Sequence, residues 1–169
     1  MSERSDAPTS VIRLADYRPP AWSVEHVALE FDLGIDRTEV AATLDLVRQA
    51  DEPIRLNGEG LELLSLGVDG RMLAEGEYIL ADGVLEIAID TDRCTVTTRV
   101  AVRPAENTAF EGLYLSGSRD RGFLLTQCEA EGFRHITFFP DRPDVLSRYT
   151  VTLRAERERF PVLLAGGNP

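Results

Sequence analysis

The sequence is poor in the residues that most metal and redox sites require. It has only two cysteines, Cys94 and Cys128, and only two histidines, His26 and His135. Two cysteines are too few for a disulfide framework, and no C-x-x-C or H-E-x-x-H spacing occurs. There is no Gly-rich phosphate loop, and no apolar run approaches the roughly 20 residues of a membrane-spanning helix. We therefore expect no metal site, no phosphate loop and no membrane span in this chain.

Positive charge is also scarce. Lys and Arg total 18 against 29 Asp and Glu, which gives a formal net charge of −11 at pH 7. Because proteins bind nucleic acids and anionic membranes largely through basic side chains, so acidic a chain predicts neither partner. The first eight residues are polar and lack the apolar core of a secretory leader. The cytoplasm is therefore the expected compartment.

The remaining composition is that of an ordinary globular protein. With 169 residues, of which 43% are hydrophobic and 28% charged, the chain is long enough for one domain that needs no disulfide or metal. Apolar and polar residues alternate along much of it, which is the period of a half-buried strand. The alternation is clearest at 27–33, 40–46, 93–103 and 149–153. Many short strands of this kind predict an all-β fold, an antiparallel β-sandwich.

Local signals refine this prediction. The Asp-Gly pairs at 69–70 and 82–83 lie between apolar strands, and they predict tight hairpins because a type I′ turn needs positive φ at its centre. The apolar parity changes between Val24 and Val27, which indicates a β-bulge near His26. An acidic start followed by proline at 141–146 predicts a short helical turn, one of at most one or two in the fold.

The two ends of the chain give further expectations. Residues 1–13 are expected to form a flexible tail, and residues 14–169 the sandwich domain. Residues 160–164 are predicted to be a strand, followed by a Gly-Gly turn without a second strand. This pattern suggests a truncated piece of a larger protein.

The most specific motifs lie between residues 104 and 149, where the strand rhythm is interrupted. They are Asn107-Thr108…Glu111-Gly112-Leu113-Tyr114, Thr126-Gln127-Cys128-Glu129-Ala130-Glu131-Gly132-Phe133-Arg134 and Asp141-Arg142-Pro143-Asp144. On these motifs, and on segments at 16–20, 55–58 and 161–168, the chain resembles the N-terminal domain of the zinc aminopeptidase N family in its bacterial cytosolic branch. The resemblance extends from about residue 14 over nearly the whole chain.

The resemblance implies a saddle-like β-sandwich domain that packs over a separate catalytic domain. In the family the catalytic domain holds zinc through an H-E-x-x-H helix and a later Glu, and it carries a G-x-M-E-N strand. Neither motif is in this sequence, so zinc and catalysis would belong to the missing domain, and this fragment alone would be inactive. The full-length enzyme would remove N-terminal residues from peptides. Within this chain, Glu129 would bind the substrate's α-ammonium and Gln127 would line the pocket for its first side chain.

The chemistry of these two residues can also be considered without the resemblance. On an extended segment Gln127 and Glu129 share a face, while Cys128 points away. A carboxylate is a natural acceptor for an ammonium with three N–H donors, and such charge-assisted hydrogen bonds are short and strong. On pattern alone, however, an exposed Glu in so acidic a chain is more often a solvated charge, and Gln127 is equally a candidate for a buried side-chain cap.

Structural roles are expected for the other charged residues nearby. Glu131 is expected to pair with Arg134 or Arg142. Asp141, Arg142 and Asp144 are expected to form salt bridges and caps that tie their loop together, rather than to belong to a binding site.

Mainly structural roles are also expected for the two histidines and the two cysteines. His26 is expected to be a satisfied strand residue, and His135 is a minor candidate for contact with substrate or metal. Cys94 has the apolar parity of its strand and is expected to be a buried free thiol. Cys128 is expected to serve in packing, and a disulfide between the two cysteines is not expected in a cytosolic protein.

Three hypotheses about function follow. A domain of an aminopeptidase predicts an exposed apolar patch of several hundred Å² with Glu129 and Gln127 at its rim. A free-standing β-sandwich module that binds peptides or glycans predicts an open sheet edge or an aromatic platform in which Trp22 or tyrosines are exposed. The third hypothesis is a structural or interaction domain without a ligand. The motifs favour the first.

Overall fold

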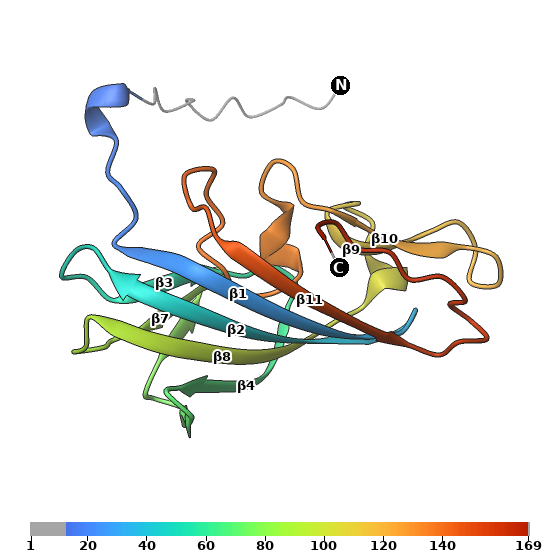
Figure 1. The fold of residues 1–169 in the computed structure, drawn as a ribbon, viewed down its shortest axis with the longest axis horizontal. Coiled ribbons are helices and arrows are strands. Elements are labelled where there is room, and N and C mark those ends of the chain that lie inside the picture. Colours follow the sequence, from blue (N-terminus) through green and yellow to red (C-terminus); the bar gives the residue numbers. More distant parts are fainter. Residues whose placement is uncertain (1–12, 169) are drawn as a thin grey trace, which may run out of the picture.

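The computed structural model describes residues 13–168, which form a β-sandwich with an additional hairpin at one end (Figure 1). The larger sheet has the strand order β11-β1-β2-β8-β4-β5, and a three-stranded sheet has the order β3-β7-β6. Strands β9 and β10 form a separate two-stranded sheet. The predicted all-β class is therefore confirmed.

The strands fall largely where apolar alternation predicts them. Their bounds are β1 Trp22–Leu33, β2 Thr38–Arg48, β3 Ile54–Asn57, β4 Glu62–Val68, β5 Arg71–Met72, β6 Ile79–Ala81, β7 Val84–Ile87, β8 Arg93–Val102, β9 Gly112–Ser116, β10 Phe123–Gln127 and β11 Arg148–Ala155. The helical elements of the described residues are single 3-10 turns: η1 Leu14–Asp16, η2 Pro104–Glu106 and η3 Gly132–His135.

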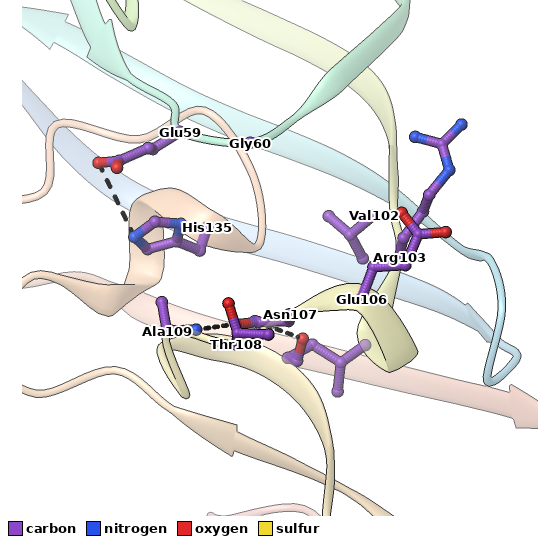
Figure 2. Close-up of a pocket in the computed structure, with 10 residues that line it drawn as sticks. Glu59, Gly60, Val102, Arg103, Glu106, Asn107, Thr108, Ala109 and His135 are labelled. Atoms are coloured by element: carbon purple, nitrogen blue, oxygen red, sulfur yellow. Dashed lines mark hydrogen bonds and ion pairs between the residues drawn. The ribbon is translucent and has the colours of Figure 1, made fainter. Parts of the chain in front are cut away.

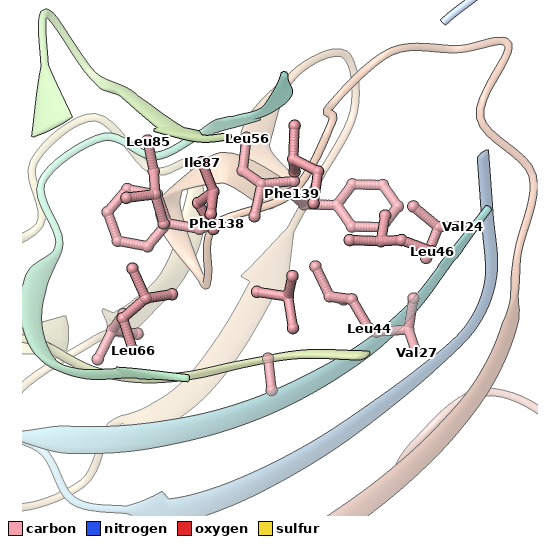
Figure 3. Close-up of a cluster of buried hydrophobic side chains, with 14 of the residues drawn as sticks. Val24, Val27, Leu44, Leu46, Leu56, Leu66, Leu85, Ile87, Phe138 and Phe139 are labelled. Carbon is pink, nitrogen blue, oxygen red and sulfur yellow. The ribbon is translucent and has the colours of Figure 1, made fainter. Parts of the chain in front are cut away.

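The core lies between the six-stranded and three-stranded sheets (Figure 3). Along β2, every second side chain is buried, and Leu44 is fully enclosed. Leu56 and Ile87 face it from the smaller sheet, and Phe138 and Phe139 fill the space between the sheets. Burying a large side chain of this kind contributes roughly 1.5–3 kcal/mol, so the chain has a continuous core of its own.

The predicted turns and bulge are present. Asp82 and Gly83 have φ values of 50° and 74°, which are those of a type I′ turn between β6 and β7. The Asp69-Gly70 pair has the same conformation between β4 and β5. The register between β1 and β2 shifts between Val24 and His26, which confirms the bulge.

Three predictions need correction. The sheet is not wholly antiparallel, because β11 pairs with β1 in parallel, for example His26 with Arg148 (Figure 1). Parallel neighbours need a long crossover. Residues 34–147 separate β1 from β11, and residues 103–147 make the last connection, from β8 to β11. Residues 141–146 form a hydrogen-bonded turn without helix, because Val145 N–H donates to Arg142 O at 3.2 Å and the turn does not continue. Residues 160–164 are not a strand, since no described strand pairs with them, and Leu164 is 85% exposed.

Two further points concern the ends of the chain and its helices. The tail predicted for residues 1–13 lies, apart from Arg13, outside the described residues. In the part of the chain that the structure describes, no helix is long and apolar enough to cross a membrane.

Candidate functional site

The predicted site residues lie at the end of the β9–β10 hairpin, which is away from β3 and β7 (Figure 1). In this hairpin Leu125 pairs with Tyr114 and Gln127 pairs with Gly112. Because side chains alternate along a strand, Phe123, Leu125 and Gln127 share one face of β10. Glu129 follows two residues after the end of the strand.

The side chains on this face are apolar and exposed to solvent. Phe123 is 58% exposed and Leu125 is 42% exposed. Phe110, which precedes β9, packs edge-on against Tyr114 with 5.4 Å between the ring centroids, and it is itself 59% exposed. We call these four residues, Phe110, Tyr114, Phe123 and Leu125, the β9–β10 apolar face. It is the kind of exposed patch that the first hypothesis predicts beside Gln127 and Glu129.

Gln127 and Glu129 are both exposed, whereas Cys128 between them is half-buried and packs against the core. The Gln127 side-chain Nε2–H donates to the backbone carbonyl of Glu129 at 3.2 Å. The peptide bond between Glu129 and Ala130 is cis. Gln127 is thus exposed and not buried, but its side chain does cap a backbone carbonyl, as the alternative interpretation expects. No hydrogen bond or ion pair to another described residue engages the Glu129 carboxylate, so this acceptor faces solvent.

Two glycines hold this segment by close backbone contact. A Cβ on Gly132 would lie 2.4 Å from the carbonyl oxygen of Gln127 and 3.2 Å from the backbone nitrogen of Gly112. A Cβ on Gly112 would lie 2.5 Å from the Cβ of His135, and Gly112 has a φ of +67°. Because a side chain fits at neither position, the hairpin end and the η3 turn approach as closely as backbones can.

The loop before β9 is held by the side chain of Asn107. Its amide donates to the carbonyls of Glu111 at 2.7 Å and Leu113 at 3.0 Å, and its oxygen accepts from the backbone N–H of Ala109 at 3.1 Å and Phe110 at 3.2 Å. One side chain thus satisfies four backbone groups of the loop. It also fixes Phe110 at a φ of +59°, which turns its ring toward Tyr114.

A cavity of about 300 Å³ lies behind this loop, and His135 lies on its wall (Figure 2). The imidazole is 15% exposed, and its Nε2 lies 3.2 Å from a Glu111 carboxylate oxygen and 3.8 Å from one of Glu59. In Figure 2, His135 stands between Glu59 and the loop that contains Asn107. Gln127 and Glu129 do not line this cavity.

The charged residues after the site form the ties that the sequence predicts. Arg134 donates from Nε to Asp141 Oδ2 at 3.2 Å and pairs with Glu131 at 3.0 Å. Arg142 holds Asp144 by two hydrogen bonds of 2.8 and 2.6 Å. This guanidinium lowers the pKa of the Asp144 carboxyl below its ordinary value. These residues fasten the segment that follows η3.

The other predicted roles are also testable against the structure. His26 Nε2 lies 2.9 Å from Thr150 Oγ1 across the β1–β11 pair, as expected of a satisfied strand residue. Cys94 is a buried free thiol, and burial raises its pKa to about 11. Burial likewise raises the pKa of the free Cys128 thiol.

The described residues do not fit a metal ion. Among residues 13–168, no group of three or more His, Cys, Asp or Glu side chains is arranged to hold one. The pairing of His135 with two carboxylates is an ion pair and falls short of a coordination shell.

Sequence reasoning missed the β9–β10 apolar face. The sequence carries only a weak signal, because both sides of β10 carry apolar residues: Phe123 and Leu125 on one side and Leu124 on the other. The structure turns Phe123 and Leu125 to solvent. The contacts that position the segment were also missed, because they join residues distant in sequence.

Comparisons with known proteins bear on the class of molecule. No protein-family model matches the sequence. The chain is 51% identical over 168 residues to aminopeptidase N of Caulobacter vibrioides, which covers 98% of this chain and 19% of that protein. It is 43% identical over 155 residues to aminopeptidase N of Escherichia coli, with coverages of 90% and 17%. The chain therefore spans less than a fifth of the length of these curated relatives.

Solved structures with a similar fold also include aminopeptidases. An aminopeptidase A from Legionella pneumophila, solved in complex with aspartic acid, matches with a TM-score of 0.81 and 33% identity over 92% of this chain and 18% of that one. An M1 zinc metallopeptidase from Deinococcus radiodurans matches with a TM-score of 0.61 over 80% of this chain and 32% of that one, and at 16% identity it shows the fold alone.

The fold is thus that of the N-terminal β-rich region of M1 zinc metallopeptidases. The sequence comparison narrows the class further than the fold does. The chain corresponds to the N-terminal region of bacterial aminopeptidase N, which confirms the resemblance found in its motifs.

Proposed function

We propose that this chain serves as the N-terminal domain of a zinc aminopeptidase that removes N-terminal residues from peptides. In the proposed full-length protein this domain covers the active site, and Glu129 and Gln127 recognise the substrate. One observation carries the proposal: two solvent-facing polar side chains stand at the rim of an exposed apolar face, on a segment whose sequence matches aminopeptidase N.

Glu129 is suited to receive the α-ammonium of a peptide. Its carboxylate is exposed and is not engaged by another described side chain, so its oxygens are available to an ammonium with three donors. An enzyme that acts only at chain ends must distinguish this charged group from an internal amide. A carboxylate held at a fixed position makes that distinction and also sets the distance from the chain end to the first peptide bond.

Gln127 is suited to line the pocket for the first side chain. It lies two residues before Glu129, and its amide donates to the Glu129 backbone carbonyl at 3.2 Å. This contact keeps the amide beside the residue that is proposed to bind the ammonium, so a side chain on the bound residue would pass close to it. We propose that residues outside this chain form the rest of the pocket.

The β9–β10 apolar face is proposed to dock on the catalytic domain. Docking would bury three large side chains that are now 42–59% exposed, Phe110, Phe123 and Leu125, and remove water from around Glu129. A carboxylate–ammonium pair becomes stronger as water is excluded. We propose that the zinc is held by that other domain, since the described residues here do not form a metal site, and that the enzyme works in the cytoplasm.

The structure does not favour the binding-module hypothesis. Trp22, its proposed platform residue, is 4% exposed, and its indole N–H donates to the Glu52 carbonyl at 2.8 Å. Tyr149 is half-exposed but packs edge-on against Phe133 at 6.0 Å between ring centroids. Tyr17 is the tyrosine that stays available, at 50% exposed, and its hydroxyl donates to Asp144 at 2.9 Å.

Hydrolysis of an alanyl chromogenic amide tests the proposal. We expect the full-length protein to be active and sensitive to a chelator, and the 169-residue chain alone to be silent. Glu129→Gln in the full-length protein should lower kcat/KM by about 10²-fold or more, if the ammonium contact is worth ~3 kcal/mol. Wild-type activity in this variant would refute the role of Glu129.

Glu131→Gln is the matched control. Glu131 is also an exposed carboxylate, two residues further on, and it is 64% exposed in its ion pair with Arg134. Exposed pairs contribute little, so this variant should retain nearly wild-type kcat/KM. An equal loss in both variants would show that the effect comes from removing local negative charge.

A further inference from the structure

His135 joins three segments that are far apart in sequence. It belongs to the η3 turn, and its Nε2 lies 3.2 Å from a carboxylate oxygen of Glu111, which precedes β9. The same nitrogen lies 3.8 Å from an oxygen of Glu59, in the loop between β3 and β4. A backbone hydrogen bond also joins the β3–β4 loop to η3, because Glu59 N–H donates to Arg134 O at 2.9 Å. The imidazole is 15% exposed, and Figure 2 shows its contact with Glu59.

Backbone contacts connect this cluster to the proposed substrate-binding segment. The Cβ of His135 lies against Gly112, where an added Cβ would be only 2.5 Å away. Gly112 pairs with Gln127 across the hairpin, and its nitrogen also lies against Gly132. Gly132 in turn abuts the Gln127 carbonyl oxygen, and its N–H donates to Cys128 O at 2.9 Å. A displacement of His135 therefore reaches the backbone on both sides of Glu129.

We propose that His135 is a positioning residue for Glu129, acting through its ion pairs with Glu111 and Glu59. The inference rests on the proposed function, because it assigns His135 a role in the affinity of that same site. His135 does not itself touch the bound amine. It holds the loop before β9 and the β3–β4 loop against η3, so that the segment carrying Glu129 is fixed before substrate arrives.

The imidazole lies between the two loops. Both carboxylates face Nε2, so this one ring contacts the β3–β4 loop and the loop before β9 at the same time. The other charged groups nearby are Arg103 and Glu106 across the cavity, and Arg134, which is engaged with Asp141.

The test compares His135→Gln with the wild type in the full-length protein. We expect KM for the alanyl amide at pH 6 to rise by up to about 5-fold, the size of ion pairs with half-exposed carboxylates, while kcat changes little. Glu111→Gln, which keeps the imidazole, should reproduce the increase in KM.

His26→Gln is the matched control. His26 is the other histidine of the chain, and it contacts Thr150 and Asp45 on the six-stranded sheet. This variant should leave KM as in the wild type. An equal change in both histidine variants would overturn the proposal.

A double-mutant cycle separates positioning from a general structural effect. If His135 acts through Glu129, then His135→Gln should add little to Glu129→Gln. Independent losses that add in the double variant would overturn the proposal. Hydrogen exchange of residues 127–132 gives a second measurement: faster exchange in His135→Gln than in His26→Gln supports the positioning role, and equal exchange rejects it.

Failure of this inference differs from failure of the proposed function. If Glu129→Gln lowers kcat/KM but His135→Gln and Glu111→Gln leave KM and exchange unchanged, then only the positioning role is wrong. If Glu129→Gln itself has wild-type kinetics, then both are wrong.

Discussion

Gly132 provides the sharpest test of how the site is held in place. A Cβ at this position would lie 2.4 Å from the Gln127 carbonyl oxygen, whereas ordinary contacts begin at 3.4 Å. The contact partners are backbone atoms, which cannot rotate away as a flexible side chain would. Gly132→Ala must therefore open the gap between η3 and the end of β10 by about 1 Å. The φ of Gly132 is not positive, so the alanine has no conformational strain of its own.

The expected effect on activity depends on which residues this opening of the gap displaces. Residues 128–131 connect the two elements that separate, so Glu129 moves with either of them. A misplacement of about 1 Å in a positioning group can cost about 10²-fold in rate. Overpacking typically costs about 1–3 kcal/mol of stability, which corresponds to a Tm lower by roughly 2–12 °C for a domain of this size. The protein should therefore remain folded while its activity is lost.

The assay is kcat/KM for the alanyl amide in the full-length protein, together with thermal unfolding. Gly166→Ala is the control, because nothing lies within 4 Å of an added Cβ there and its φ is not positive. Activity of Gly132→Ala within about twofold of the control would refute the reasoning, since it would show that the packing of η3 on β10 does not set the position of Glu129.

Three other perturbations test the core and the charged groups. Phe138→Ala should cost about 3–5 kcal/mol of unfolding free energy, and chemical denaturation measures it; a cost below about 1 kcal/mol would contradict its place between the sheets. Burial raises the pKa of Cys94 to about 11. The neutral thiol therefore contributes to the free energy of unfolding below about pH 9, and this contribution is lost as pH rises toward 11. The Cys94→Ala variant should not show this loss of stability. The native Cys94 thiol should also react slowly with iodoacetamide at pH 8 and quickly after unfolding, as mass spectrometry would show. Because Arg142 lowers the pKa of Asp144, Asp144→Asn should lower Tm at pH 7, and the difference should vanish as pH falls below about 4; a constant difference would exclude the ion pair as its cause.

Local pattern predicted the strands that face the core. β1, β2 and β8 have one apolar side and one polar side, and each forms where its alternation lies. The Asp-Gly turns were equally predictable, since their backbone conformation is a property of two residues. In these elements, the local preference and the tertiary structure agree.

The failures occur where partners are distant or missing. The residues at 160–164 are an apolar run like a buried strand, but backbone hydrogen bonds need a neighbour, and none of the described strands supplies one. The parallel register of β11 on β1 depends on the course of a long crossover, which no short window contains. Strand β10 was missed because it does not alternate between apolar and polar residues, and its Phe123 and Leu125 face solvent.

The candidate site was predictable only in part. The motif around Gln127 and Glu129 identified their segment, but the extended geometry assumed for it ends at Gln127, and Glu129 lies in the turn that follows β10. Their support was not predictable, because Glu59, Glu111 and His135 come from three separate segments. The tight approaches at Gly112 and Gly132 likewise appear only when the backbones are placed together.

The pairing of β1 with β11 also affects the order in which the domain can be built. Contacts such as His26 with Thr150 join residues 124 positions apart. During synthesis from the N-terminus, β1 and β2 can pair early, but the other edge of β1 stays open until β11 has emerged. An open strand edge is a template for pairing with other chains, and closing so long a loop is slow. A nascent chain that stalled before residue 148 would therefore present this edge to its neighbours, and aggregation should be most pronounced for truncations that end just short of β11.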